Sequence, residues 1–391
     1  MAAVLITDPV FVAAALGVPA GQSRSATTSD FSTLSARAEA ARAAGRLDEA
    51  APLYRKALAM RPEWKEGWWA LGTILYDQEL HATAARAFRR LLVLDSNNGT
   101  AHLMLALCEY QVERDASAME HIQTAKKLGV QKDGELPHVL SYHEAMLLLR
   151  GRRYERALEA LQPLVAGGVD EENLHIGLGL CVLLMRPQDA PSEGSPGREI
   201  VLRAGRAERH HLAKEFDAAR VGYSTLVQEF PRFPNIHYAY GRFLLATGDL
   251  DRGVAQFLEE ITNSPGHVRA RMQIAAARFR VDSAAAIPFA AEVVKLEPRY
   301  PFGRYLLGLL YFDVGDIGRA IPELEAAARM VPQEAQFQFT LGNAYARAGK
   351  KEAAARARAA FARLNGEGDA NSRPRFDLDA VTIPGDHKHQ R

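Results

Sequence analysis

Small residues recur along the chain at a nearly constant interval, and most are followed by a larger apolar residue four positions on. Ala50 and Ala84, for example, are followed in this way by Tyr54 and Phe88, and the two pairs are 34 residues apart. The series comprises Ala50, Ala84, Ala118, Gly253, Ala286, Ala320 and Ala354. A fixed period of this length is typical of repeats that each form a helix, a turn and a second helix. The pattern therefore predicts an all-α fold of stacked helix pairs.

A second series of small residues precedes the first by twelve positions in most units. Two helices pack closely only where one surface lacks bulk, so these positions are expected to face the partner helix. Leucine at Gly72 or Gly342 should then overpack the pair and cost about 1–3 kcal/mol. Glycines such as Gly45, Gly248 and Gly315 lie between the two series and permit a positive φ after a helix end. The second series comprises Ala38, Gly72, Ala106, Ala145, Ala207, Gly241, Gly308 and Gly342.

One stretch carries a more specific pattern. Residues Glu66 to Asp95 read EGWWALGTILYDQELHATAARAFRRLLVLD. This stretch resembles the tetratricopeptide repeat family, whose repeats carry the skeleton W-LG--Y---A---F. The resemblance implies a right-handed superhelical solenoid of helix-turn-helix repeats. The predicted units are residues 31–64, 65–98, 99–132, 138–171, 200–233, 234–266, 267–300, 301–334 and 335–368.

The repeat pattern is interrupted in the middle of the chain. Residues 172–185 look like a first helix without its second, which neighbouring pairs on both sides should cover, and residues 186–199 are rich in proline. This break is either a surface insertion or a hinge. The predicted organisation is a tail or signal segment at 1–30, an N-terminal repeat array at 31–185, a proline-rich linker at 186–199, a C-terminal repeat array at 200–368 and a disordered tail at 369–391.

The two ends of the chain carry short apolar patterns. Residues 10–18 form an apolar run, and Val18 and Ala20 fit the small-residue pattern of a signal-peptidase site. A cytoplasmic location is favoured, with export after cleavage near Ala20 as the alternative. The run is too short for a transmembrane segment, which needs about 20 apolar residues. Near the other end, Phe376, Leu378, Val381 and Ile383 alternate in a way that suits a docking strand.

Net charge excludes one class of partner. The formal charge is +1, from 48 basic and 47 acidic residues, so no bulk electrostatic argument supports a nucleic-acid partner. Cys108 and Cys181 lie in apolar helical stretches and are expected to be buried free thiols. No cofactor is expected.

Catalytic and metal-binding motifs are incomplete. The stretch HEAML at 143–147 begins like a zinc-protease helix, but Leu147 stands where the second histidine ligand is needed. His210, His211 and Glu215 lie within one or two turns of a helix, and His211 and Glu215 could share a metal with a third ligand such as Glu208 or His237. Solvated or capping histidines explain the same residues, so a metal-dependent enzyme is the alternative and no metal site is predicted.

The inward positions of the first helices form the candidate binding surface. In tetratricopeptide repeat proteins this face binds extended peptides or partner helices, so the resemblance implies a recognition groove, although the aromatic residues could instead pack between adjacent first helices. Arg242 and Asn343 are expected to carry little packing. The candidate residues are Trp69, Tyr76, Tyr110, Tyr142, Met146, Tyr238, Arg242, Tyr305, Phe312, Phe339 and Asn343.

These observations predict a non-catalytic scaffold that binds a protein or peptide of unknown identity on its concave face. The alternatives are the metal-dependent enzyme at His210 and His211 and a purely architectural subunit whose groove is filled by its own tail.

Overall fold

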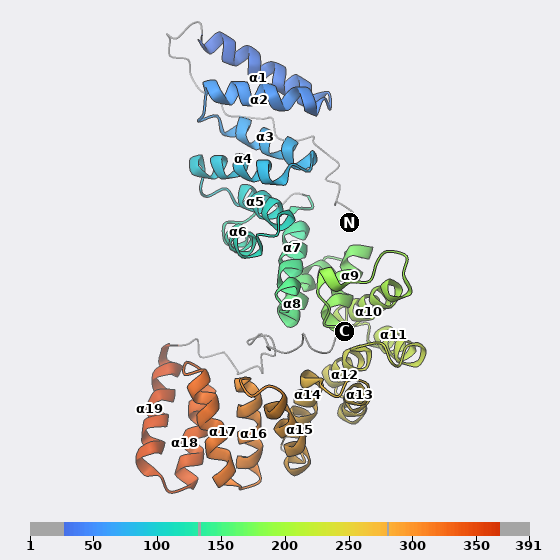
Figure 1. Ribbon diagram of the computed structural model, residues 1–391, viewed down its shortest axis with the longest axis vertical. Helices are drawn as coiled ribbons and strands as arrows, with labels where there is room; N and C mark the ends of the chain where they lie inside the picture. The colour runs from blue at the N-terminus through green and yellow to red at the C-terminus, as the bar shows by residue number, and fades with distance from the viewer. Residues whose placement is uncertain (1–26, 132–133, 280, 368–391) are drawn as a thin grey trace. The chain divides into compact units, whose positions relative to one another are not determined.

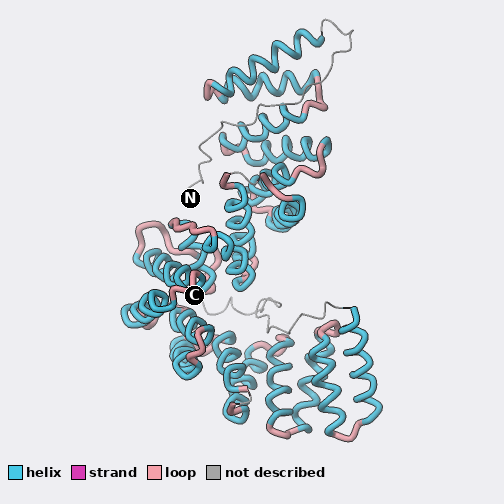
Figure 2. Tube along the Cα trace, turned by 180° about the vertical axis from the view of Figure 1, so that it is seen from behind, coloured by secondary structure: helices cyan, strands magenta, loops and turns pink. Residues whose placement is uncertain are grey.

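The computed structural model describes residues 27–131, 134–279 and 281–367. This part of the chain contains nineteen α-helices, one short 3-10 helix and no strand (Figures 1 and 2). The predicted all-α helical repeat solenoid is therefore confirmed. The expectations for the apolar run at 10–18 and for the tail at 369–391 concern residues outside the described ranges.

The helices follow one another as pairs joined by short turns, with one exception in the middle. The first and second helices of each pair are α1 (Thr27–Ala43) and α2 (Leu47–Met60), α3 (Lys65–Asp77) and α4 (His81–Leu94), α5 (Gly99–Gln111) and α6 (Asp115–Leu128), α7 (Leu136–Arg150) and α8 (Tyr154–Ala166), α10 (Pro196–Leu212) and α11 (Phe216–Glu229), α12 (Ile236–Ala246) and α13 (Leu250–Asn263), α14 (Val268–Arg278) and α15 (Ser283–Leu296), α16 (Pro301–Asp313) and α17 (Ile317–Met330), and α18 (Ala335–Arg347) and α19 (Lys351–Glu367). Helix α9 (Glu172–Val182) stands alone, followed by the 3-10 helix η1 (Pro187–Asp189).

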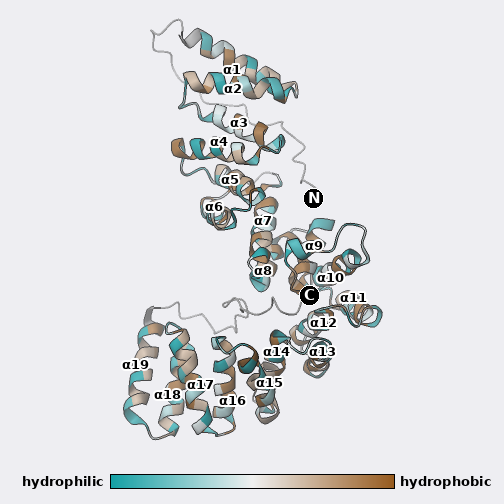
Figure 3. Ribbon diagram, viewed as in Figure 1, coloured by the Kyte–Doolittle hydropathy of each residue, from teal (hydrophilic) through white to brown (hydrophobic). Residues whose placement is uncertain are grey.

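The chain divides into two compact units, Met1–Arg114 and Asp115–Arg391. The proline-rich segment 186–199, which we expected to join two arrays, lies inside the second unit. In the structure the boundary between the two compact units falls between α5 and α6. The predicted division into two repeat arrays joined by a linker remains a prediction. In both units the helices carry hydrophobic and hydrophilic residues together, as Figure 3 shows, because each helix buries one side against its neighbours.

The small residues of the first helices face bulky apolar side chains of the second helices. A Cβ atom added at Gly72 would lie 2.7 Å from Cε1 of Phe88, and one at Gly241 would lie 2.7 Å from Cε1 of Phe257. Both phenylalanines are fully buried. In both pairs the phenylalanine lies sixteen positions after the glycine, which is four positions after the small residue of the first series. The two series of small residues thus belong to one contact, in which the phenylalanine ring occupies the space of the absent Cβ atom.

The turn inside each pair except α14–α15 contains one residue with a positive φ among the described residues. Glycine occupies this position in some repeats, for example Gly45 at 72° and Gly315 at 84°, whereas Glu79 at 59° and Lys214 at 63° occupy it in others. After α3, the Leu80 N–H donates to the Leu75 carbonyl oxygen at 2.9 Å, which closes the helix end in the manner of a Schellman motif. The predicted role of the turn glycines is confirmed, and several repeats adopt the same turn without glycine.

Helix α9 packs against α10 through backbone contact. A Cβ atom at Gly179 would lie 2.0 Å from the Val201 carbonyl oxygen, and one at Gly205 would lie 1.7 Å from the His175 carbonyl oxygen. Helix α9 also contacts α7 and α8. The expectation that neighbouring pairs on both sides cover this lone first helix is confirmed. Gly179 of α9 and Gly205 of α10 are the reason that the two helices can approach so closely.

Gly72 and Gly342, where we expected a larger residue to cost the same stability, differ in their surroundings. At Gly342 an added Cβ atom would lie 3.3 Å from Cγ of Arg358, a long side chain that can move, whereas the Phe88 ring near Gly72 is enclosed. Gly72→Ala should therefore lower the stability of the first unit by about 1–3 kcal/mol. Gly342→Ala should be neutral or stabilising by up to about 1 kcal/mol, because alanine favours the helix. Denaturant unfolding of both variants measures the difference, and equal midpoints would contradict this account.

Candidate peptide-binding site

All of the candidate binding residues lie on first helices. In the first unit, α3 carries Trp69 and Tyr76, and α5 carries Tyr110. In the second unit the residues are Tyr142 and Met146 on α7, Tyr238 and Arg242 on α12, Tyr305 and Phe312 on α16, and Phe339 and Asn343 on α18. Within the second unit, α10 contacts α12, α14 contacts α16 and α16 contacts α18, while successive second helices approach each other less closely. The first helices therefore line the inner side of this array.

Three candidates belong to the core. Tyr238 is fully buried, and its ring lies 5.0 Å from that of His267 on the next pair. Tyr305 stacks on Phe337 of the next pair at 4.5 Å and shares a 3.0 Å hydrogen bond with Thr340. Met146 is also buried. For these residues the structure favours the alternative of packing between first helices.

The remaining candidates keep part of their surface accessible. Phe339 is the most exposed of them at 42%, because α18 is the last first helix in the described part of the chain and no further pair covers it there. Phe312 is half-buried, and the guanidinium of Arg347 lies 4.2 Å from its ring centroid. The other half-buried candidates are Trp69, Tyr76, Tyr110, Tyr142 and Asn343.

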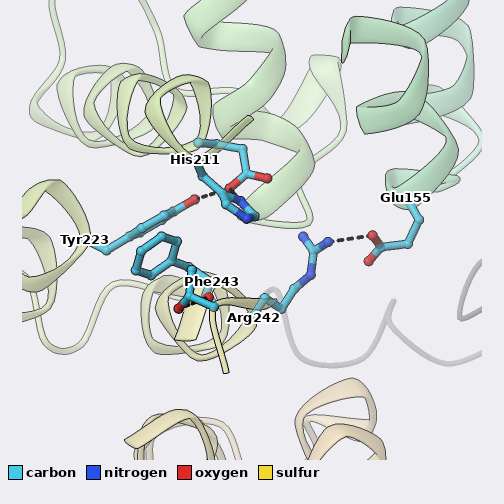
Figure 4. Close-up of polar contacts among 7 residues, drawn as sticks. Glu155, His211, Tyr223, Arg242 and Phe243 are labelled. Carbon is cyan, nitrogen blue, oxygen red and sulfur yellow. Dashed lines mark hydrogen bonds and ion pairs between the residues drawn. The ribbon is translucent and has the colours of Figure 1, made fainter. Parts of the chain in front are cut away.

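Arg242 is part of the folded structure rather than a free groove residue. Its Nη2 donates to Oε2 of Glu155 on α8 at 2.6 Å, and the two side chains are only 20% and 26% exposed (Figure 4). The contact joins residues 87 positions apart in the chain. The expectation that Arg242 carries little packing is therefore wrong.

A buried carboxylate lies on α10, beside the Arg242 ion pair. Tyr223 donates to Oε2 of Glu208 at 2.6 Å, and Nδ1 of His211 lies 3.2 Å from the same oxygen (Figure 4). Burial alone would raise the pKa of Glu208, but the contacts with His211, Arg242 and Tyr223 outweigh it and hold that pKa below its ordinary value. Burial likewise raises the pKa of Tyr223 far above its ordinary value. The hydrogen bond between them thus keeps the Tyr223 hydroxyl protonated and the Glu208 carboxylate charged.

The histidines of the metal-site alternative contact different carboxylates. His210 pairs with Glu215, whereas His211 pairs with Glu208. His237, proposed as a third ligand, contacts Gln256 at 2.7 Å and the Pro231 carbonyl oxygen at 3.0 Å. Within residues 27–131, 134–279 and 281–367, no group of three or more histidine, cysteine, aspartate or glutamate residues is arranged to hold a metal ion. Cys108 and Cys181 are buried free thiols, as expected.

A pocket of about 420 Å³ lies in the second unit, where the start of α14 meets the turn between α7 and α8. Arg269 is only 6% exposed, and its guanidinium lies 5.3 Å from the ring centroid of Tyr154. The carboxylate in the lining, Asp189, accepts two hydrogen bonds from Arg186 at 2.5 and 2.9 Å. Sequence analysis did not find this pocket. Its principal lining residues are Arg152, Tyr154, Leu184, Asn235, His267 and Arg269.

Hydrogen bonds fix the rear of this pocket. The Ala270 N–H donates to Nδ1 of His267 at 3.0 Å, so Nε2 carries the proton and donates to Oδ1 of Asn235 at 2.8 Å. Asn235 in turn donates from Nδ2 to the Leu183 carbonyl oxygen at 2.7 Å. Burial, aided by the nearby Arg269, lowers the pKa of His267 to about 3, so this imidazole is neutral. This chain of hydrogen bonds links the C-terminal end of α9 to the starts of α12 and α14.

The profile of the tetratricopeptide repeat family matches residues 35–99, 70–129, 213–268 and 305–367, together more than half of the chain. The protein therefore belongs to the tetratricopeptide repeat family, and it is a helical repeat scaffold. No helix in the described ranges is both long and apolar enough to cross a membrane.

Individual proteins give weaker similarities. A stretch of 75 residues is 32% identical to Protein O-mannosyl-transferase TMTC3 of Homo sapiens, and it covers 19% of this chain but only 8% of that protein. A solved structure of MamA from Desulfovibrio magneticus RS-1 is 22% identical with a TM-score of 0.42, covering 45% of this chain and 99% of that one. Another MamA structure is 18% identical with a TM-score of 0.41, covering 46% of this chain and 98% of the other.

The ion pair of Arg242 leads to a stability prediction. Arg242→Ala should destabilise the second unit by about 1–3 kcal/mol, because it removes a largely buried partner of Glu155. Asn343→Ala is the control: it replaces a polar residue at the equivalent position of another first helix and should change stability by less than about 0.5 kcal/mol. Urea unfolding compares them. An Arg242→Ala variant as stable as Asn343→Ala would show that the ion pair is not formed in solution.

The neutral His267 predicts a pH effect. The unfolded chain binds a proton at this residue below its ordinary pKa of 6.5, whereas the folded chain does not until about 3, so stability is present above 6.5 and is lost as the pH falls towards 3. His267→Asn should reduce the slope of the unfolding free energy against pH, between pH 3 and 6.5, by up to about 1.4 kcal/mol per pH unit. Asparagine already caps a first helix of this protein, since Asn98 at the start of α5 accepts from the Ala101 N–H at 2.9 Å. Urea unfolding at several pH values tests this, and an unchanged slope would contradict it.

Proposed function

We propose that this protein is a non-catalytic scaffold that binds a segment of another protein along the first-helix face of its C-terminal repeats. The observation that carries the proposal is the selective exposure of Phe339. Aromatic residues at the equivalent position of earlier repeats, Tyr238 and Tyr305, are covered by the next pair, whereas Phe339 presents a large apolar surface to solvent. Exposed aromatic side chains are common anchors of protein interfaces.

Neighbouring residues support a binding surface that is not purely apolar. Asn343 lies one helical turn from Phe339 on α18 and is half-buried. Its amide can donate to and accept from the backbone of an extended peptide. Phe312, with Arg347 over its ring, extends the same surface onto α16. We call Phe312, Phe339, Asn343 and Arg347 the terminal surface.

The alternatives receive less support. His210 and His211 each have their own carboxylate partner, and His237 contacts an amide and a backbone carbonyl oxygen instead. A transferase function is not inferred from the TMTC3 match, because the match covers so little of that protein. A purely architectural role would require that the terminal surface be covered within the protein's own assembly. We expect the partner to be a protein, without a cofactor.

The experiment first identifies a partner by affinity capture and mass spectrometry, and then measures its affinity for purified variants. Phe339→Ala should weaken binding by about tenfold or more, as expected for an aromatic anchor. Asn343→Ala should weaken it to a smaller extent.

Phe216 supplies a matched control. It is 45% exposed, close to the 42% of Phe339, but it begins the second helix α11. Each ring also has an aromatic neighbour, Phe361 for Phe339 and His211 for Phe216. Phe216→Ala should leave the affinity unchanged. If both phenylalanine variants bind the partner as the parent does, the binding site is not on the terminal surface.

A further inference from the structure

The last helix pair in the described part of the chain leaves two aromatic rings incompletely covered. Phe339 of α18 is 42% exposed, Phe361 of α19 is half-buried, and their ring centroids lie 5.2 Å apart. The residues at the position of Phe361 in the two preceding pairs, Val293 and Ala327, are fully buried. No helix follows α19 within the described ranges (Figure 1). We call Phe339 and Phe361 the end face.

The sequence beyond α19 does not supply the cover that a regular repeat would give. Within the array, Phe337 and Leu341 of α18 are buried, and Phe337 stacks on a ring of the preceding pair. The residues 34 positions further along the chain are Asn371 and Arg375, and both are polar. Another helix pair in the same register would therefore place polar side chains where stacking needs apolar ones.

A segment with large apolar side chains follows instead. Between Gly368 and Arg391, every Val, Leu, Ile, Met, Phe, Tyr or Trp lies in the segment 376–383, which reads Phe-Asp-Leu-Asp-Ala-Val-Thr-Ile. Phe376 and Leu378 are two positions apart, so in an extended conformation both point to one side and the neighbouring aspartates point to the other. Contact between this apolar side and the two rings removes both surfaces from water, which favours docking. The match needs no charged group on the end face.

The connection from α19 is about twice as long as it needs to be. Six residues of helix from Phe361 to Glu367 rise about 9 Å. Because the Phe339 ring lies 5.2 Å from that of Phe361, it is on the order of 15 Å from Glu367. An extended chain from Glu367 to Phe376 spans about 30 Å. As a random coil, the same chain has a root-mean-square length of about 15–18 Å, which is close to the distance to be spanned and so maximises the effective concentration of the tethered segment.

We propose that the segment 376–383 docks on the end face of its own chain and covers Phe339. A partner that uses Phe339 as an anchor then has to displace this segment, so the segment regulates the proposed binding site. This consequence rests on the proposed function, whereas the docking itself is measurable without a partner.

The test measures the binding of a fluorescein-labelled peptide of residues 368–391 by fluorescence anisotropy. The receptor is the full chain with Phe376→Asp and Leu378→Asp, which prevents its own segment from docking. This receptor should bind the peptide at least about tenfold more tightly than the parent chain, in which the tethered segment competes at an effective concentration in the millimolar range. A peptide with the same two substitutions should not bind the receptor.

Two further measurements locate the bound peptide. In the receptor background, Phe339→Ala should weaken peptide binding by about tenfold, as expected for loss of an aromatic contact. Phe216→Ala is the matched control and should not weaken it, because Phe216 is 45% exposed but lies at the start of α11. A peptide with photoreactive benzoylphenylalanine in place of Phe376 should crosslink to α18 or α19 of the receptor, which tests the location without altering the receptor's fold.

Several results would overturn the docking. These are absence of peptide binding to the receptor, equal binding by the receptor and the parent chain, equal binding by Phe339→Ala and Phe216→Ala, and crosslinks confined to other helices. A parent chain that is dimeric by light scattering, with a monomeric receptor variant, would also overturn it and would assign the segment to a second copy.

The partner of the terminal surface separates this inference from the proposed function. That partner should bind the chain with Phe376→Asp and Leu378→Asp about tenfold more tightly than the parent chain, because no tethered segment competes. If the peptide docks as expected but the partner binds both chains equally, the proposed use of Phe339 by the partner fails while the docking stands. If Phe339→Ala weakens partner binding but the peptide does not bind, the docking fails while the proposed function stands.

Discussion

The contact between a glycine on the first helix and a large apolar side chain on the second sets the geometry of at least three helix pairs. At Gly72 and Gly241 the space of the absent Cβ is filled by the rings of Phe88 and Phe257, and at Gly308 an added Cβ would lie 2.7 Å from Cγ of Leu324. This contact fixes how closely the two helices approach. Since each repeat is stabilised mainly by its neighbours, a constant separation within pairs lets successive pairs present the same surfaces to one another.

Stacking then assigns different roles to chemically similar residues. Tyr305 and Phe339 occupy the same position of successive repeats, yet Tyr305 is 5% exposed and Phe339 is 42% exposed. The difference arises because Phe337 and Thr340 of α18 cover Tyr305, whereas no further pair follows Phe339 within the residues that the structure describes. The position of an aromatic residue within its repeat therefore does not decide by itself whether that residue is buried.

The interruption at α9 creates the polar features of the second unit. Because α9 lacks a second helix, α10 packs directly on it through Gly179 and Gly205, and the ends of α9, α12 and α14 come together around Asn235. Arg242 reaches Glu155 across this region. The pocket with Arg152 and Arg269 in its lining lies beside the same junction, so the break in the repeat pattern coincides with a cavity in the second unit.

The sequence by itself determined the all-α repeat fold, the positions of the helix pairs and the lone helix at 172–185. These features depend on local spacing, helix-capping turns and small residues, which the period of the sequence records directly. It also predicts that Phe339 and Asn343 face inward. Only the tertiary structure decided that Tyr238 and Tyr305 are core residues, that Arg242 pairs with Glu155, and that Arg152 meets Arg269 around one pocket. Those outcomes depend on contacts between repeats far apart in the chain, and a repeat period specifies which side of a helix a residue occupies but not which neighbour covers it.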